Sequence, residues 1–530
     1  MVKQFLQSVS EPIVDTTGGK IRGFQFDKIY KFYGIKYADA ERFQKPKPVK
    51  PWDGVKDALC YGHICPHMDR SSLPGDLTAG LPRMWPENEH CQYLNIWTDT
   101  LDKKAKKSVM VWLHGGMFTI GSSMELDCYD GENMAKFRDV VFVSLNHRLN
   151  ILGHLDMTGF DSKYENSVNA GMADIVEALK WIRDNIESFG GNPDNITIYG
   201  HSGGGRKVTT LMQTPEAKGL FHKGIIQSGT ALWNPVSSKH HKKLVEFMLD
   251  ELDIPHSEYT ALERVPYPVL IRAYNRAGAK LLEQDGIQNE WYPVKNDWFL
   301  GAPPFHAFTE YANKVPLIIG SVIAEVPVSP PMPDKDSYSP EKRREIIKDM
   351  YGDAADRLIE LFKKAYPDKN ELLLLDLDQR YRPNLLNYVD RKLDEADPGV
   401  PVYVYMFSLE FDINGRKGAW HGAEMPFTFH NAEAVPAYQI DGVRDKLQNE
   451  MSGAWASFAH TGDPNHSGLA EKWPKYDKAS RGVMIFDRTS SVRYDHEKEL
   501  VALHKTVLDE LGITGRSPQT FNVDKEKWLY

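Results

Sequence analysis

A serine stands at the centre of a glycine-rich turn, Gly200-His201-Ser202-Gly203-Gly204, between an expected strand at 196–199 and a helix expected to begin near Gly205. Where a strand turns sharply into a helix, the middle residue is held in a strained conformation and its side chain projects clear of the sheet. Glycines two positions before and after are needed because a Cβ atom would collide across the turn. The pattern predicts a serine nucleophile; the alternative is an ordinary turn, as at Gly121-Ser122-Ser123.

A second glycine-rich segment, His114-Gly115-Gly116-Met117, follows another expected strand and precedes the serine in the chain. Acyl transfer through a tetrahedral intermediate needs backbone N–H donors for the oxyanion, and losing one costs roughly 3–4 kcal/mol of transition-state stabilisation. We expect the N–H groups of Gly116, Met117 and Gly203 to form this oxyanion hole. Alone, the His-Gly-Gly sequence would indicate a plain turn; together with the serine turn it indicates an acyl-transfer site.

A sheet must hold both turns in place. Short β-branched runs at 108–113 and 140–145 indicate buried strands, and residues 172–189 have the apolar spacing of one helix face. Further expected strands lie at 224–227, 316–319 and 401–407. The alternation predicts an α/β fold with a large, mostly parallel twisted sheet and helices on both faces. The segments 236–315 and 329–400 have helical, charged, proline-punctuated patterns, so we expect them to be insertions that form the pocket rim of one domain spanning 1–530.

Several ordered motifs resemble those of the type-B carboxylesterase and cholinesterase-like family, and the resemblance covers nearly the whole chain. One such motif is Glu89-His90-Cys91-Gln92-Tyr93-Leu94-Asn95-Ile96. The other matching blocks lie at 32–38, 42–43, 51–52, 169–193, 290–300, 458–464 and 473–476. The resemblance implies the α/β-hydrolase fold and an esterase activity.

The resemblance also implies a catalytic triad. It places the acid five residues after Gly320, at Glu325, and the base at the start of His421-Gly422-Ala423-Glu424. The chain order serine, acid, histidine is that of α/β-hydrolases. An imidazole can take the serine proton near neutral pH, and a buried carboxylate fixes its tautomer. Glu424, which follows the histidine closely, is the alternative acid. Residue types alone do not single out one pair among 18 histidines and 73 carboxylates.

The chain departs from the family pattern at several positions, among them Gly203, which stands where the family commonly has alanine, and a shortened loop before Arg42. His201 stands where the family commonly has glutamate, and we expect it to be a packed neighbour of the serine rather than the base. Met117 replaces the third oxyanion glycine, so we expect its N–H to donate and its side chain to narrow the acyl pocket. Lys36 replaces a proline near the pocket rim.

Further candidates follow from position alone. Ser228 resembles a family serine that supports the triad, and the alternative is a simple turn at the end of a strand. The candidate pocket-wall residues are aromatic, and ordinary core packing is the alternative for each. They are Trp85, Phe118, Trp233, Trp291 and Phe427.

The composition limits the possible partners. Lys and Arg number 64 against 73 Asp and Glu, a net charge of −9, whereas nucleic-acid binding and docking on anionic membranes need a basic surface. We expect neither partner, and no apolar run reaches the roughly 18 residues of a spanning helix.

No cofactor is implied, and the four cysteines lack the close pairing of a zinc site. The first residues have no signal-peptide core, so a cytoplasmic protein is expected unless a leader has been removed.

The resemblance implies one further pairing. Cys91 matches a cysteine that the family often joins in a disulfide, and Cys65 is its natural partner here, with Cys60 as the alternative. In a reducing cytoplasm we expect Cys65 and Cys91 to be thiols.

We therefore expect a serine carboxylic-ester hydrolase that forms an acyl-enzyme with small to medium, hydrophobic or aryl esters. Its oligomeric state is left open. The alternatives are a hydrolase of an amide, carbamate or thioester, a lipase, and a binding protein of the same family that has lost catalysis. Such binding proteins typically lack the serine or the histidine, and this chain has both Ser202 and His421.

Overall fold

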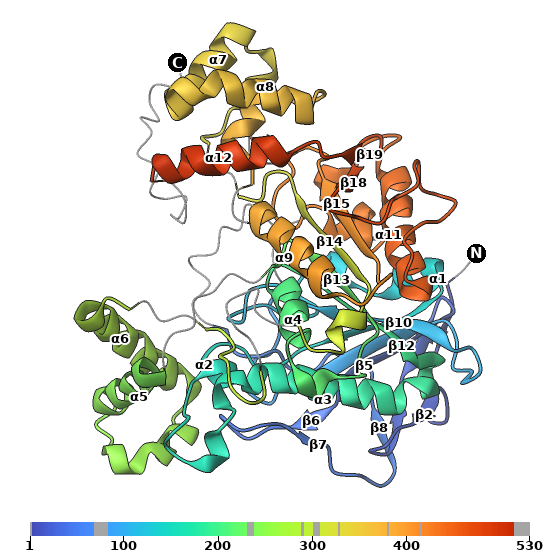
Figure 1. The fold of residues 1–530 in the computed structure, drawn as a ribbon. Coiled ribbons are helices and arrows are strands. Elements are labelled where there is room, and N and C mark those ends of the chain that lie inside the picture. Colours follow the sequence, from blue (N-terminus) through green and yellow to red (C-terminus); the bar gives the residue numbers. More distant parts are fainter. Residues whose placement is uncertain are drawn as a thin grey trace.

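A mixed sheet of twelve strands within the described chain forms the frame of the protein (Figure 1). This computed structural model describes residues 3–67, 83–230, 238–287, 291–299, 308–326, 329–378, 381–413 and 416–512. The central neighbours run parallel, in the order β11 (Val140–Leu145), β10 (Lys107–Leu113), β12 (Gly191–His201), β13 (Lys223–Gln227), β14 (Leu317–Val322), β15 (Val402–Phe407) and β18 (Gly482–Phe486). The predicted mostly parallel sheet is confirmed.

Antiparallel strands extend both edges of this sheet. Beyond β11 lie, in order, β9 (Tyr93–Thr98), β5 (Ile29–Lys36), β4 (Phe24–Phe26) and β1 (Phe5–Leu6); beyond β18 lies β19 (Ser491–Tyr494). The smaller sheets combine β2 (Ile13–Asp15), β3 (Lys20–Arg22) and β8 (Val55–Asp57), β6 (Ala38–Asp39) with β7 (Lys47–Pro48), and β16 (Phe411–Ile413) with β17 (Arg416–Gly418).

Helices cover both faces of the large sheet (Figure 1). One pair is α3 (Ala170–Asn185) with α4 (Gly203–Leu211), and another is α1 (Glu132–Arg138) with α11 (Arg444–Thr461). Because both faces are covered, β11, β13, β14 and β15 are buried along their whole length. This double burial explains why these strands appear in the sequence as nearly continuous apolar runs.

The two predicted insertions are helical where they are described. In the first, α5 (Ser238–Glu251) packs against α6 (Tyr267–Asp285); in the second, α7 (Pro340–Tyr351) packs against α8 (Ala355–Ala365), and α9 (Arg382–Glu395) lies beside β14. The remaining helices are α2 (Asn150–His154), α10 (Met425–Thr428) and α12 (Lys498–Glu510). Within the described residues, no helix is long and apolar enough to cross a membrane. That the chain is a single domain stays a prediction.

The turn around Ser202 is tighter than expected from the sequence. β12 continues to His201 and α4 begins at Gly203, two residues before the expected start, so one residue makes the whole turn. Gly203 and Gly204 are helical because their close contacts with neighbouring backbone hold them in place. A Cβ atom on Gly204 would overlap the carbonyl oxygen of Leu113 at the end of β10.

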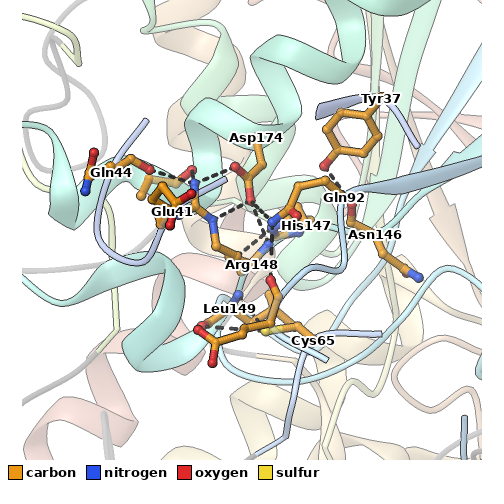
Figure 2. A network of polar contacts seen from close by, with 12 residues as sticks. Tyr37, Glu41, Gln44, Cys65, Gln92, Asn146, His147, Arg148, Leu149 and Asp174 are labelled. Atoms are coloured by element: carbon orange, nitrogen blue, oxygen red, sulfur yellow. Dashed lines mark hydrogen bonds and ion pairs between the residues drawn. The ribbon is translucent and has the colours of Figure 1, made fainter. Parts of the chain in front are cut away.

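A buried ion pair fixes the loop that leaves β11 (Figure 2). The guanidinium of Arg148 donates to Asp174 of α3 through Nε (2.9 Å) and Nη2 (2.6 Å). Its other N–H groups donate to the carbonyl oxygens of Glu41 and Gln44, each at 2.9 Å. Both charged side chains are almost fully buried, at 2% and 0% exposure. The pair therefore holds the neighbouring His147 in a fixed position relative to α3.

Replacing Asp174 should strongly destabilise the fold. Asp174→Ala leaves the buried Arg148 charge without a partner, which typically costs about 3–5 kcal/mol. We expect a reduction of that size in the free energy of unfolding, measured by denaturant titration. The double variant R148M/D174L should lose less because neither charge remains. Asp356→Ala, which breaks an exposed pair with Arg344, serves as the control and should change stability little. An unchanged D174A midpoint would contradict this role.

Candidate active site

Ser202 occupies the one-residue turn between β12 and α4. Its backbone has φ 55° and ψ −119°, a conformation that a non-glycine residue adopts only under constraint. The constraint is visible in its hydrogen bonds: its N–H donates to the Gln227 carbonyl at the end of β13 (2.8 Å), and its own carbonyl accepts from Arg206 N–H (3.1 Å). The serine thus stands at the N-terminus of a nine-residue helix, where the helix dipole favours negative charge.

The segment predicted to supply oxyanion donors lies directly against this turn. A Cβ atom on Gly203 would overlap the backbone nitrogen of Met117, and one on Gly115 would lie 3.7 Å from the Cβ of Ser202. Gly116 (φ 76°) and Met117 (φ 59°) both have left-handed backbones. That conformation lets the Gly116 carbonyl accept from Thr119 N–H (3.2 Å) and Ile120 N–H (3.1 Å). The structure therefore brings Gly116, Met117 and Gly203 together beside Ser202.

His421 and Glu325 are in direct contact. Glu325 follows β14 and is 1% exposed; its Oε2 lies within hydrogen-bond distance of His421 Nδ1. The His421 N–H donates to the Glu325 carbonyl (2.9 Å), and Glu325 Oε1 accepts from Val322 N–H (3.2 Å). Glu325 therefore engages Nδ1, one of the two ring nitrogens of His421. The side chain of His421 is 21% exposed, so its ring is accessible from outside.

His201 lies between the serine turn and the histidine loop. Its ring centroid is 4.3 Å from that of His421, and the side chain is 4% exposed. Burial, together with the neighbouring His421, holds the pKa of His201 well below its usual value, so its ring is neutral. Within the described chain its Nε2 has no hydrogen-bond partner. His201 is thus a buried side chain packed against the His421 ring. No hydrogen bond within the described residues joins Ser202 Oγ to His421, and such bonds often form only when substrate is bound.

Glu424, the alternative acid, points elsewhere. It is fully buried, and its Oε1 accepts from Gln227 Nε2 (3.4 Å) and Tyr405 Oη (3.3 Å). Burial and, second, the charge of Glu325 raise the pKa of Glu424 to about 8, so it is protonated at neutral pH. Glu325 is thus the carboxyl group within hydrogen-bond distance of the His421 ring, and Glu424 bonds to Gln227 and Tyr405 instead.

Tyr381 completes the surroundings of the histidine. Its ring stacks on His421 with centroids 5.1 Å apart and an angle of 25° between the planes. Nothing in the sequence marks this tyrosine, because it lies 40 residues before His421 at the start of α9 and belongs to no recognisable motif. Only the fold of the second insertion reveals it.

The lower-ranked candidates are spread more widely. Ser228 is buried at the end of β13; its N–H donates to the Gly320 carbonyl (2.8 Å), while its Oγ has no partner within the described chain. Phe118 lies behind the oxyanion segment, edge-on to His154 (5.3 Å). Trp291 stacks on Tyr274 of α6 (3.9 Å).

Two further aromatic candidates have identified packing partners, and a third lies outside the described residues. Trp85 donates from Nε1 to the Met124 carbonyl (3.0 Å). Phe427 packs in the core against Phe407 (5.6 Å). Trp233 lies outside the described residues.

The four cysteines, Cys60, Cys65, Cys91 and Cys128, are free. Cys65 Sγ accepts from Leu149 N–H at 3.2 Å. Burial, together with the neighbouring Cys65, raises the pKa of the Cys91 thiol well above its usual value. Within the described residues, no group of three or more His, Cys, Asp and Glu side chains could hold a metal ion.

The model of the carboxylesterase family matches residues 10–503. The chain belongs to the carboxylesterase family. Among its relatives, a para-nitrobenzyl esterase of Bacillus subtilis (strain 168) is 31% identical over 93% of this chain and 98% of its own length. A phenmedipham hydrolase of Pseudarthrobacter oxydans is 30% identical over 90% of this chain and 95% of its own.

A solved structure extends this family assignment to the fold. An esterase from Clostridium hathewayi, described as able to hydrolyze aliphatic aromatic polyesters, superposes with a TM-score of 0.90 and 43% identity, covering 96% of this chain and 100% of its own. A thermophilic pNB esterase superposes with a TM-score of 0.72 and 29% identity, covering 93% of this chain and 100% of its own. The chain is therefore a carboxylesterase with the α/β-hydrolase fold, as expected from the sequence.

The raised pKa of Glu424 predicts how stability depends on pH. The folded protein holds this proton up to about pH 8, whereas an unfolded glutamate releases it near pH 4.3. The resulting stabilisation is present in full below the unfolded pKa and is lost as the pH rises through about 8, at roughly 1.4 kcal/mol per pKa unit.

Glu424→Gln, which cannot ionise, should remove this loss. The free energy of unfolding of E424Q, measured by denaturant titration at pH 5, 6.5 and 8, should decline less with rising pH than that of the wild type. Glu433→Gln, at an exposed carboxylate of the following loop, should follow the wild type. Parallel curves for E424Q and the wild type would contradict a protonated Glu424.

Proposed function

We propose that Ser202 is the nucleophile of a two-step ester hydrolysis, with His421 as base and Glu325 as its orienting acid. The contact between Gly203 and the backbone nitrogen of Met117 carries this proposal. It supports a site in which N–H donors from two separate segments converge beside one serine. An ordinary glycine-rich turn has no reason to lie against a second glycine-rich loop.

In the first step His421 Nε2 takes the proton of Ser202 as Oγ attacks the ester carbonyl. The N–H groups of Gly116, Met117 and Gly203 donate to the resulting oxyanion. Glu325, on Nδ1, fixes the tautomer of the imidazole and stabilises the imidazolium.

His421 then returns the proton to the leaving alcohol, which breaks the ester C–O bond and leaves the acyl group on Ser202. In the second step His421 takes a proton from water, which attacks the acyl-enzyme. Collapse of that second tetrahedral intermediate releases the acid and returns the proton to Ser202.

We propose that the substrates are small to medium esters with hydrophobic or aryl groups. Two similar proteins support this proposal: one is named a para-nitrobenzyl esterase, and the other is described as able to hydrolyze aliphatic aromatic polyesters. A cytoplasmic location and an organisation as one domain over 1–530 remain part of the proposal; the free thiols of Cys65 and Cys91 support the former.

Ser202→Ala should abolish hydrolysis of para-nitrophenyl butyrate while leaving thermal unfolding unchanged. Only the hydroxyl is lost, so kcat should fall by a factor of at least about 10⁴. A fluorophosphate should label Ser202 in the wild type, as located by peptide mass spectrometry, and should not label S202A. Ser162→Ala, at an exposed serine, should retain full activity. Substantial hydrolysis by S202A would contradict the mechanism, and matched amide, carbamate and thioester substrates would test the alternative acyl bonds.

Met117→Gly tests the acyl pocket. Met117 has a left-handed backbone and a half-buried side chain, so glycine preserves the N–H donor and relieves strain while it removes bulk. The ratio of kcat/KM for para-nitrophenyl benzoate to that for the acetate should rise about 10-fold or more, since each methylene of pocket space is worth about 1–3 kcal/mol. The acetate value itself should change little. An unchanged ratio would show that Met117 does not line the acyl pocket.

A further inference from the structure

A fully buried lysine lies behind the oxyanion segment. Lys207, in α4, is five residues after Ser202 and is 0% exposed. Its Nζ donates to the carbonyl oxygen of His114 (2.8 Å) and, at a longer distance, to that of Gly115 (3.5 Å). Within the described residues, neither an ion pair nor another hydrogen bond engages this ammonium. The loop therefore has a positive charge directly on its backbone carbonyls.

The acceptors are significant because of the peptide groups to which they belong. The Gly115 carbonyl is in the same peptide unit as the Gly116 N–H, one of the proposed oxyanion donors. The next peptide unit carries the Met117 N–H, and its Gly116 carbonyl accepts from Thr119 and Ile120. A donor bound to a peptide carbonyl polarises the unit and strengthens its N–H as a donor. The Gly115 carbonyl also accepts from His114 Nδ1 at 2.9 Å, so His114 and Lys207 both contact this peptide unit. The shorter Lys207 bond, to the His114 carbonyl, holds the preceding peptide unit in place.

Other ionisable groups surround this lysine without pairing with it. His114 and His147 stack at 5.1 Å with 23° between their planes, and His154 lies in α2. Burial, followed by the charge of Lys207, lowers the pKa of both stacked imidazoles well below its usual value. His154, buried too, has a pKa lowered to about 3. These neighbours are therefore neutral, and the partly buried Glu125 is the carboxylate whose charge favours the protonated lysine.

We propose that Lys207 is a positioning residue of the esterase, which holds and polarises the His114–Gly116 backbone so that its N–H groups stabilise the oxyanion. The inference rests on the proposed function of that segment. Ser202 immediately precedes α4 and Lys207 lies within it, so one short segment carries both the proposed nucleophile and the side chain that contacts the oxyanion segment. Burial lowers the pKa of Lys207 to about 7, so the charge itself titrates within the working pH range of an esterase.

Lys207→Met is the main test because it preserves the length and apolar volume of the side chain and removes the charge and its donors. Deleting an oxyanion donor outright costs about 10²–10³ in kcat. Loss of the Lys207 ammonium, which only supports such a donor, should therefore lower kcat for para-nitrophenyl butyrate about 10-fold, with KM within about twofold of the wild type. The inhibition constant of an aryl trifluoromethyl ketone, which forms a tetrahedral adduct with serine, should rise by the same factor as kcat falls.

The chain offers a matched control in Lys392 of α9. It is also 0% exposed, and its Nζ donates to the backbone carbonyl of Ala312, away from the serine turn. Burial lowers its pKa to about 8, as for Lys207. Lys392→Met should alter thermal unfolding without changing kcat or the inhibition constant of the fluoroketone. Equal losses of kcat in K207M and K392M would overturn the proposal by showing a general effect of removing a buried lysine.

The pH profile supplies a readout independent of any variant. In the wild type, kcat should fall as the pH rises from 7 to 9, because Lys207 loses its proton, and this alkaline decrease should be absent in K207M. If K207M does not fold, as judged by circular dichroism, Lys207→Gln replaces it with the same expectations. A wild-type kcat that stays level from pH 7 to pH 10 would overturn the role of the charge.

Fluorophosphate labelling separates this inference from the mechanism on which it rests. Labelling of Ser202 in both the wild type and K207M, with kcat reduced in the variant, supports both. Labelling of Ser202 in both, with kcat, the fluoroketone constant and the pH profile unchanged, overturns the role of Lys207 alone. Absence of the label from Ser202 of the wild type overturns the mechanism and the inference together.

Discussion

The contact of the α4 backbone with the ends of β10 and β12 is the constraint on which the site depends. Gly204 lies on the Leu113 carbonyl and Gly203 lies on the Met117 nitrogen, with no room for a Cβ atom at either position. Ser202 and the loop beside it are therefore positioned by direct contact between their backbones. Such contacts have no rotamers to choose between, so the relative positions of Ser202 and the oxyanion segment hold in the absence of substrate, as preorganised catalysis requires.

The buried ionisable groups near this contact are of two kinds, paired and unpaired. Arg148 and Asp174 are both buried and fully paired, and they hold a loop against α3. Lys207 and Glu424 are equally buried and have no ionic partner within the described residues, and burial shifts the pKa of each toward its neutral form. An unpaired buried group reduces stability, and such groups concentrate where function requires them. The paired groups hold the loop after β11 against α3. Lys207 instead contacts the carbonyl oxygens of the proposed oxyanion segment, and Glu424 bonds to Gln227 and Tyr405.

The sequence predicts the strands and the serine turn well, but it does not by itself predict the residues that the fold brings beside that turn. The strands at 108–113, 140–145 and 401–407 are found at nearly the expected residues, because doubly covered strands are continuous apolar runs. The serine turn is also visible in the sequence, since its glycines have a steric cause. Only the family resemblance indicates Glu325 and His421, because these two residues are 96 positions apart in the sequence and follow different strands. Tyr381 and Lys207 have no local signal at all, since their roles depend on which backbone the fold brings beside them.

Whether a site residue can be predicted depends on where it lies in the chain relative to the central strands. Ser202, the oxyanion segment and Glu325 all follow parallel strands of the central sheet directly, so their positions are tied to the most buried part of the molecule. Trp291 and Tyr381 instead belong to the helical insertions before β14 and β15, which attach to the sheet at their ends. Changes in those insertions can reshape the walls around an ester without moving the contact between α4 and β10. Met117 is the exception, because its backbone belongs to the oxyanion segment while its side chain adds bulk beside the serine. Under the proposed mechanism, one residue would then contribute both to the frame of the site and to the size of the acyl group that it accepts.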